Sequence, residues 1–327
     1  MRRRDFLRGL AASAFGPSPA VAADAPPETT KLTLARDPTI CPAPMYVAEQ
    51  LLKGEGFTEV RYVPMASDQN IPQLLSSGKA DISTDAAPIL LLALDAGDAI
   101  VLLGGLHVGW YELFTTPSIR TMRDLKGKTV AISQLRDDRH AFVAAILTHV
   151  GLDPRKDIHW VTHPADESMR LLAAGKIDAF LGFPPEPQEL RAKKIGHVLL
   201  DTRTDRPWSQ YFCCMLAGNR QFVRKNPVAT KRAIRAVLKV NALCASEPER
   251  VARFLVDRGY VTTLDYAVQT LKELPYAGWR EYDPEDSARF YALRLHEGGM
   301  IKSTPQKLLA QSTDWRFFNE LKKELKG

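Results

Sequence analysis

A short segment occurs twice in this chain, and this repetition constrains the fold more than any other feature of the sequence. Residues 72–82 read PQLLSSGKADI, and residues 169–179 read MRLLAAGKIDA. Each copy combines the end of a helix, a glycine suited to a left-handed C-cap and a strand that begins after an aspartate. Solenoid architectures need a longer series of copies than this. Two copies therefore predict two similar lobes.

Short apolar runs alternate with helical periods on both sides of the repeat. The first strands are expected at residues 31–35, 60–63 and 81–83, and the alternation restarts at residues 128–132. Strands that alternate with helices are typical of βαβ units and parallel sheets. After a further strand near residues 212–216 the pattern is almost entirely helical. We therefore expect an α/β fold of two βαβ lobes, with the helical C-terminal region docked on the first lobe.

The composition is that of an ordinary globular protein, with 327 residues, 45% hydrophobic and 25% charged. At roughly 100–200 residues per domain, this length suggests about two domains. The formal net charge is +6, and it is only about half as large without the arginine-rich start of the chain. Such a weakly basic chain does not support nucleic-acid binding, which needs a clustered basic surface. No apolar run approaches the roughly 18 residues of a membrane span.

The amino terminus has the order of charged, weakly apolar and small residues that is typical of an export signal. Residues 2–7 read RRRDFL, residues 10–15 are mildly apolar, and residues 20–22 read AVA. The paired arginines resemble those of a twin-arginine signal, and the alternative is a disordered basic tail. We expect residues 1–23 to be a signal peptide of the twin-arginine type that is cleaved near Ala22. The mature chain is then expected to be soluble in the periplasm.

Four cysteines, Cys41, Cys213, Cys214 and Cys244, are scattered along the chain. They show neither the spacing of a disulfide framework nor that of a zinc site. No cysteine follows the signal closely enough for lipid attachment. Cys213 and Cys214 lie in an apolar run and are expected to be buried packing residues. We expect no metal and no cofactor.

Five further segments occur in an order that is typical of one family. They are LSSGKADI at residues 75–82, DLKGK at 124–128, LLAAGKID at 171–178, FVRKNP at 222–227 and WRFF at 315–318. Over nearly the whole mature chain, this order resembles the periplasmic substrate-binding proteins of ABC importers. The similar branch includes nitrate, sulfonate and taurine binders and thiamine-precursor proteins.

The resemblance implies the two-lobed periplasmic binding protein fold of type II, in which two crossover strands join the lobes. The crossovers fit at residues 112–116 and 211–216. Lobe 1 is then expected to comprise residues 31–116 and 213–327, and lobe 2 residues 117–212. The family also implies a small-molecule ligand in the cleft, a monomer, and an inner-membrane permease with its ATPase as partners. In open α/β sheets, ligands lie at the carboxyl ends of the strands.

The first lobe offers four candidate ligand contacts at such positions. Thr39, Cys41 and Tyr46 belong to the loop and helix that follow the first strand. Prolines in this loop remove N–H donors, which favours a shape-selecting wall over an anion site. Asp85 follows the third strand, where it either caps the next helix or contacts the ligand.

Aromatic and imidazole groups lie near both expected crossovers. His107 and Trp110 follow the fourth strand, and Trp208 precedes the second crossover. Each tryptophan either stacks on a planar ligand or packs the hinge, because large aromatic residues are usually core residues.

The second lobe offers two arginines and a carboxylate. Arg136 and Arg139 lie in residues 133–140, where a strand leads into a helix N-terminus. Such a place suits an anionic group, and the alternative is a solvated charged turn. Phe183 and Glu186 follow the repeat strand, in a position equivalent to that of Asp85. Glu186 is expected either to select a ligand that has a cationic or hydrogen-bond-donating group, or to be a solvated residue just past the strand.

The sequence favours a binding protein over an enzyme, because catalytic motifs such as a nucleophile elbow or a phosphate-binding loop are missing. The ligand expected from this mixture of groups is a small organic acid or a planar heterocycle. Two alternatives stay open. One is a Cys/His-dependent thiamine-pyrimidine precursor enzyme of the same fold. The other is a ligand-sensing module for a membrane receptor.

Overall fold

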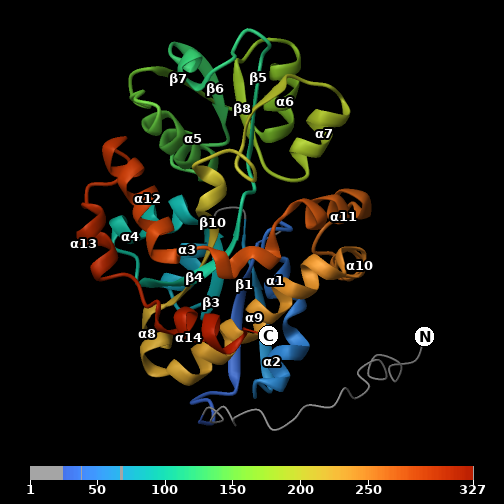
Figure 1. Cartoon of the computed structure of the whole chain (residues 1–327), viewed down its shortest axis with the longest axis vertical. Coiled ribbons are helices and arrows are strands. Elements are labelled where there is room, and N and C mark those ends of the chain that lie inside the picture. The colour runs from blue at the N-terminus through green and yellow to red at the C-terminus, as the bar shows by residue number, and fades with distance from the viewer. Residues whose placement is uncertain (1–24, 38, 67–68, 327) are drawn as a thin grey trace.

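Two five-stranded sheets form the centres of two lobes that lie one above the other along the long axis (Figure 1). The computed structural model describes residues 25–326 except residues 38, 67 and 68. The signal peptide expected at residues 1–23 lies outside the described residues. Among the helices of the described part, none combines the length and the apolarity that a bilayer crossing requires.

The first sheet has the order β2-β1-β3-β10-β4, in which β1 is parallel to β2 and β3, and β10 is antiparallel to β3 and β4. Its strands are β1 (Lys31–Arg36), β2 (Glu59–Pro64), β3 (Ile82–Ala86), β4 (Ile100–Val108) and β10 (Phe212–Asn219). The helices within this part are α1 (Ala43–Val47), α2 (Glu49–Gly54), α3 (Ile71–Ser76) and α4 (Ala87–Ala96).

The second sheet repeats this arrangement in the order β7-β6-β8-β5-β9. Its strands are β5 (Glu112–Thr115), β6 (Lys128–Ile132), β7 (Ile158–Thr162), β8 (Ala179–Gly182) and β9 (His197–Asp201). The helices are η2 (Met122–Leu125), α5 (Asp138–His149), α6 (Ala165–Ala173) and α7 (Glu186–Ala192). The two lobes therefore share one topology, as the repeat predicts.

The chain passes between the lobes twice, after β4 and after β9. The first crossing is short, because β5 already pairs with β8 and β9 of the second sheet. The lobe boundary expected at residue 116 would assign β5 to the first lobe. Its strand pairing places β5 in the second lobe instead. The second crossing contains η3 (Trp208–Gln210) and leads into β10 of the first sheet. The predicted α/β fold with two crossovers is otherwise confirmed.

The two copies of the repeat make the same local contacts. Gly78 and Gly175 have positive φ values of 73° and 64°, as a left-handed C-cap requires. The carboxylate of Asp81 accepts the backbone N–H of Thr33 at 2.7 Å. In the second lobe, Asp178 accepts the N–H of Thr129 at 2.9 Å. Each repeat aspartate thus ties the start of the central strand of its sheet to the parallel strand beside it.

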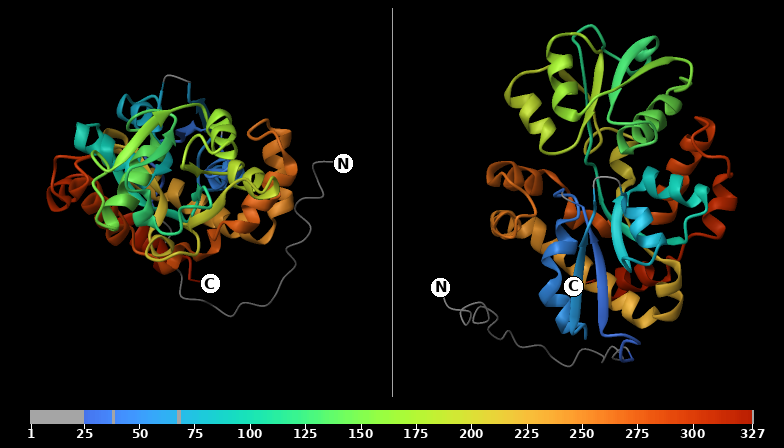
Figure 2. Two further views of the ribbon diagram at one scale, coloured as in Figure 1. Left: turned by 90° about the horizontal axis from the view of Figure 1, so that it is seen from above. Right: turned by 180° about the vertical axis from the view of Figure 1, so that it is seen from behind.

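The C-terminal region is helical and packs mainly on the first lobe (Figure 2). Its helices are α8 (Arg220–Lys225), α9 (Pro227–Ser246), α10 (Pro248–Asp257), α11 (Leu264–Glu273), η4 (Tyr276–Glu281), α12 (Pro284–Glu297), α13 (Pro305–Ala310) and α14 (Arg316–Glu324). Helix α9 contacts α1, α2 and α14, and α12 contacts α4. Two of these helices also reach the second lobe: α12 contacts α5, and Glu273 of α11 pairs with Arg191 of α7 at 2.8 Å.

Candidate ligand-binding site

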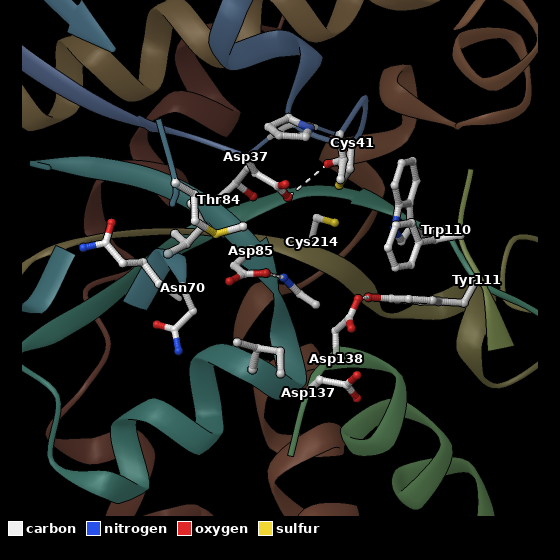
Figure 3. Close-up of a pocket in the computed structure, with 18 of the residues that line it drawn as sticks. Asp37, Cys41, Asn70, Thr84, Asp85, Trp110, Tyr111, Asp137, Asp138 and Cys214 are labelled. Atoms are coloured by element: carbon white, nitrogen blue, oxygen red, sulfur yellow. Dashed lines mark hydrogen bonds between the residues drawn. The ribbon is translucent and has the colours of Figure 1, made fainter. Parts of the chain in front are cut away.

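A cavity of about 300 Å³ lies where the two lobes meet (Figure 3). Its first-lobe wall comes from the carboxyl ends of β1 and β3 and from β10, and its second-lobe wall comes from the segment before α5. Trp110 and Tyr111, in the first crossing, also line it. Strand ends of this kind are where open α/β sheets place their ligands.

Two carboxylates of the first lobe line this cavity, Asp37 after β1 and Asp85 at the end of β3. Neither is paired with a cation among the residues that the structure describes. Asp37 accepts the hydroxyl of Thr39 at 3.0 Å, and Asp85 accepts the N–H of Ala86 at 2.7 Å. Ala86, not Asp85, stands at the N-cap position of α4. Asp85 therefore lines the cavity and does not act as the helix cap.

Burial raises the pKa of Asp37 to about 7. Burial and the nearby Asp37 carboxylate raise the pKa of Asp85 well above its ordinary value. The cause in both cases is loss of hydration, which penalises the charged form of a carboxyl group. A ligand that donates hydrogen bonds or carries positive charge would offset this penalty.

The loop before α5 binds its own carboxylate. Asp137 is the N-cap of α5 and accepts the N–H of His140 at 2.8 Å. The same side chain accepts the N–H groups of Ser133 and Gln134, each at 3.0 Å. The donors that an external anion would need at this helix N-terminus are thus already used. The loop has the geometry of an anion-binding site, but the carboxylate of Asp137 takes the place of the anion.

The two arginines expected near this loop have protein partners. Arg136 lines the cavity, and its guanidinium donates to the carbonyl of Met300 at 3.1 Å. Arg139 is 3% exposed and forms two hydrogen bonds with Glu186, at 2.9 and 2.7 Å. Glu186 also accepts the N–H of Phe183 at 3.1 Å. Arg139 and Glu186 therefore form a buried pair behind the cavity wall, and neither lines the cavity.

Trp110 and Phe183 form a flat wall of the cavity. Their rings are nearly parallel, at 13°, with centroids 6.0 Å apart. Trp208 instead packs the second crossing, where its ring lies 5.8 Å from Phe142 and 5.2 Å from Phe290. The sequence left both roles open for each tryptophan. The structure places Trp110 at the cavity and Trp208 in the hinge core.

The remaining candidates from the first lobe lie at and behind the cavity. Thr39 and Cys41 line it. Tyr46 is buried, donates its hydroxyl to the carbonyl of Asp37 and stacks on Tyr260 at 4.7 Å. His107 is fully buried behind Cys41. Tyr46 and His107 thus support the cavity wall without facing the cavity.

Among the residues that line the cavity, Asp37, Asp138 and Cys214 carry polar or reactive groups that sequence reasoning did not include in the site. Asp37 could have been found, because it directly follows the first strand at the sheet edge where ligands bind. Asp138 accepts the hydroxyl of Tyr111 at 3.3 Å and so joins the second lobe to the first crossing. Cys214 is buried, as expected, but it also borders the cavity.

The sheet topology, the two crossings and the cavity between the lobes define the periplasmic binding protein fold. The chain belongs to the NMT1/THI5-like family, whose model matches residues 42–251. The resemblance expected from the sequence motifs is thereby confirmed at the level of the family.

Relatives and solved structures agree with this assignment. The bicarbonate-binding protein CmpA of Synechococcus elongatus is 28% identical over 112 residues, which are 34% of this chain and 24% of CmpA. The chain thus matches about a quarter of the length of this curated relative.

Solved structures match nearly the whole chain. The nitrate-binding protein NrtA of Synechocystis PCC 6803 has a TM-score of 0.73 at 15% identity, over 92% of this chain and 90% of that one. The sulfonate-binding protein SsuA of Methylobacillus flagellatus KT has a TM-score of 0.68 at 18% identity, over 90% and 94%. The desulfurization enzyme DSZB has a TM-score of 0.59 at 16% identity, over 90% and 99%. The shared fold therefore occurs in both binding proteins and an enzyme.

Proposed function

We propose that this chain is a periplasmic solute-binding protein that delivers a small ligand to an ABC importer and does not transform it. The observation that carries this proposal is the cavity between the lobes, to which both lobes contribute. Its relatives and structural neighbours include proteins that bind bicarbonate, nitrate and sulfonates. We further propose a monomer, exported with its signal peptide, whose partners are a membrane permease and its ATPase.

The cavity favours a planar heterocycle with N–H donors over an organic acid. Asp37 and Asp85 provide two acceptors that form no ion pair among the described residues, and an anionic ligand would be repelled by them when they ionise. The N–H group of His140 in the first turn of α5, and those of Ser133 and Gln134 before it, bind Asp137 and not an external anion. Trp110 offers a flat apolar face to a ring. An aminopyrimidine combines the ring and the donors that these groups require.

Ligand binding is expected to hold the lobes together. A ligand shifts an equilibrium between open and closed forms only by its different affinity for the two. The cavity is walled by both lobes, so a ligand there gains contacts in the closed form that the open form lacks. Hinge closure around a ligand is a general property of binding proteins of this architecture.

Calorimetric titration of the purified chain with an aminopyrimidine tests the proposal, with taurine and nitrate as anionic comparison ligands. We expect stoichiometric binding of the aminopyrimidine, its recovery unchanged by mass spectrometry, and a smaller radius of gyration by small-angle scattering. At a hundred times its Kd the ligand should stabilise the chain by about 2.7 kcal/mol. Tight binding of taurine or nitrate, with none of the aminopyrimidine, would contradict the proposed ligand class.

A Cys/His-dependent enzyme is a second candidate, because the Sγ atom of Cys41 lies 3.1 Å from Nε2 of His107 beside the cavity. Thiol and imidazole at this distance are the arrangement of a Cys–His nucleophile, but burial raises the pKa of the Cys41 thiol well above its ordinary value, which disfavours activation. If the chain converts the aminopyrimidine chemically and the Cys41→Ser variant does not, the chain is an enzyme and the proposed binding function is wrong.

A further inference from the structure

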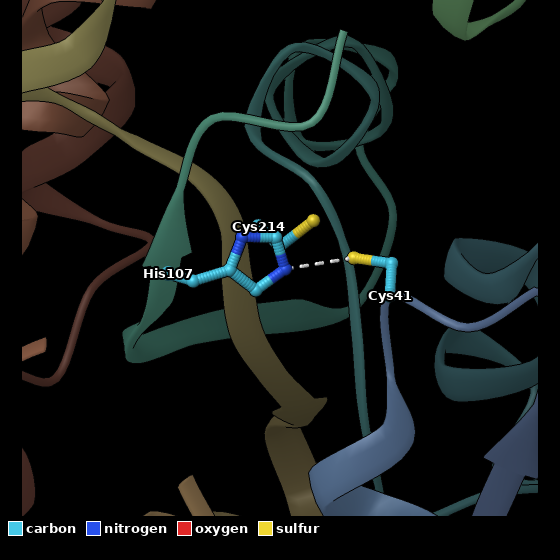
Figure 4. Close-up of side chains that lie close together, drawn as sticks. All are labelled: Cys41, His107 and Cys214. Carbon is cyan, nitrogen blue, oxygen red and sulfur yellow. Dashed lines mark hydrogen bonds between the residues drawn. The ribbon is translucent and has the colours of Figure 1, made fainter. Parts of the chain in front are cut away.

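Three side chains that can ligate a metal ion lie close together beside the cavity: Cys41, His107 and Cys214 (Figure 4). One ligand atom from each lies within 4.8 Å of the other two, and all three residues are buried. Cys41 follows β1, His107 lies in β4 and Cys214 lies in β10, so the three come from separate parts of the first lobe. The sequence spacing alone does not show this cluster.

The pairing of β10 with β4 places two of the ligands side by side. Cys214 lies opposite His107, and the register shifts between Phe212 and Cys214. This shift makes Cys213 an additional residue in β10, and such bulges re-aim neighbouring side chains. The pairing thus sets the thiol of Cys214 beside the imidazole of His107.

Cys41 is held in place by Tyr276. The hydroxyl of Tyr276 donates to the carbonyl of Cys41 at 3.1 Å. The ring of Tyr276 also packs edge-on against the imidazole of His107, with centroids 5.0 Å apart. One buried side chain therefore positions both the loop that carries Cys41 and the imidazole that faces it.

The tautomer of His107 follows from its neighbours. Its Nδ1 atom lies 3.1 Å from the carbonyl oxygens of both Val108 and Gly109. Carbonyl oxygens only accept hydrogen bonds, so the Nδ1 atom carries the proton in the neutral ring. The lone pair of Nε2 then points toward Cys41. Histidines that bind metals are usually oriented by such a hydrogen bond from the second ring nitrogen.

We propose that Cys41, His107 and Cys214 bind a thiophilic d¹⁰ metal ion, Zn²⁺ or Cu⁺. Two sulfur donors and an imidazole are the set that these soft ions prefer. Cys41 and Cys214 both border the cavity, so the ion keeps an open position toward it. Cu⁺ would need only the three protein ligands, whereas Zn²⁺ would take a fourth from the cavity. The site goes beyond the proposed function and does not depend on it.

Metal titration of the purified, reduced and metal-free chain tests this site. Zn²⁺ and Cu⁺ are titrated separately against chromophoric chelators, and Co²⁺ serves as a spectroscopic probe for Zn²⁺. We expect one ion per chain and a thiolate-to-cobalt charge-transfer band. Tighter competition by one of the two ions identifies which of them the site prefers. Absence of one-to-one binding by both ions would overturn the proposal.

Cysteine variants separate the site from adventitious metal binding. Cys41→Ser and Cys214→Ser should each weaken metal binding by at least about tenfold and abolish the cobalt band. Cys244→Ser is the matched control, because Cys244 is a fully buried thiol in α9 outside the cluster. An unchanged cobalt band in the Cys41→Ser, Cys214→Ser double variant would overturn the proposal.

A measurement on the unmodified chain covers the case in which these variants do not fold. Bound metal should slow the alkylation of Cys41 and Cys214, as read by peptide mass spectrometry at a denaturant concentration at which both buried thiols react in the metal-free chain. Equal alkylation with and without metal would overturn the site. Titration of the aminopyrimidine in the presence of a chelator measures the proposed function separately. Loss of one binding activity with retention of the other distinguishes which proposal has failed.

Discussion

The two walls of the cavity differ in how their charges are used, although the two lobes share one topology. The first-lobe wall presents Asp37 and Asp85, and neither forms an ion pair in the described part of the chain. On the second-lobe side, Arg139 is paired with Glu186 and Asp137 caps its own helix. Identical scaffolds thus carry different chemistry in the loops that follow their strands. We infer that the first lobe recognises the ligand and that the second lobe covers it.

The largest expected effect tests whether the charged pair of the second lobe is structural. Arg139→Ala leaves Glu186 buried without its partner, which typically costs about 3–5 kcal/mol of unfolding free energy. Denaturant unfolding of the variant measures this loss.

The control for Arg139→Ala removes both charges at once. Arg139→Met combined with Glu186→Leu leaves no uncompensated charge, so it should lose much less stability than the single variant. A stable Arg139→Ala chain with strongly reduced aminopyrimidine affinity would instead make Arg139 a ligand contact, and the comparison between the walls would fail.

A smaller effect is expected from the carboxylates, and it separates the two lobes directly. Asp85→Asn keeps the shape of the side chain but removes a charged acceptor. It should weaken aminopyrimidine binding by on the order of 1.5–3 kcal/mol, or roughly ten- to hundredfold in Kd. Asp137→Asn is the matched change in the second lobe. Because asparagine caps helices about as well as aspartate, calorimetry should show nearly unchanged affinity. Equal losses in both variants would contradict a division of labour between the lobes.

An effect on stability, and not on ligand affinity, is expected from pH and Asp37. Its pKa of about 7 in the folded chain lies above the ordinary carboxyl value, so the folded state binds a proton that the unfolded state releases first. Stability from this group therefore falls as the pH rises from about 4 to 7. Asp37→Asn removes the ionisable group, so the variant should not lose this stability as the pH rises. Its thermal midpoint should exceed that of the parent chain by a few degrees at about pH 8 and match it at about pH 4.

A lower thermal midpoint of Asp37→Asn at high pH would contradict this prediction. If the midpoint of Asp37→Asn falls below that of the parent chain at high pH, the ionised carboxylate is stabilised by its surroundings. The first-lobe wall would then be internally satisfied like the second, and the difference between the two walls would disappear.

Much of the architecture could be predicted because it depends on short stretches of chain. The repeat at residues 72–82 and 169–179 predicted two similar lobes, and its glycines form left-handed turns that depend only on neighbouring residues. Helix and strand periods and turn residues are read locally, so the α/β class and the helical C-terminal region followed from them. The order of the motifs along the chain was sufficient to predict the family.

The chemistry of the site depended on partners that are distant in the sequence. Arg139 meets Glu186 from 47 residues away, and Cys41 meets His107 from 66 residues away. A sequence shows that an arginine follows a strand, but not whether another side chain already neutralises it. Burial decides that question, because a buried charge must find a partner inside the protein. The sequence by itself predicted the sheet edges at which the cavity lies, and only the tertiary structure decided which side chains remain available there.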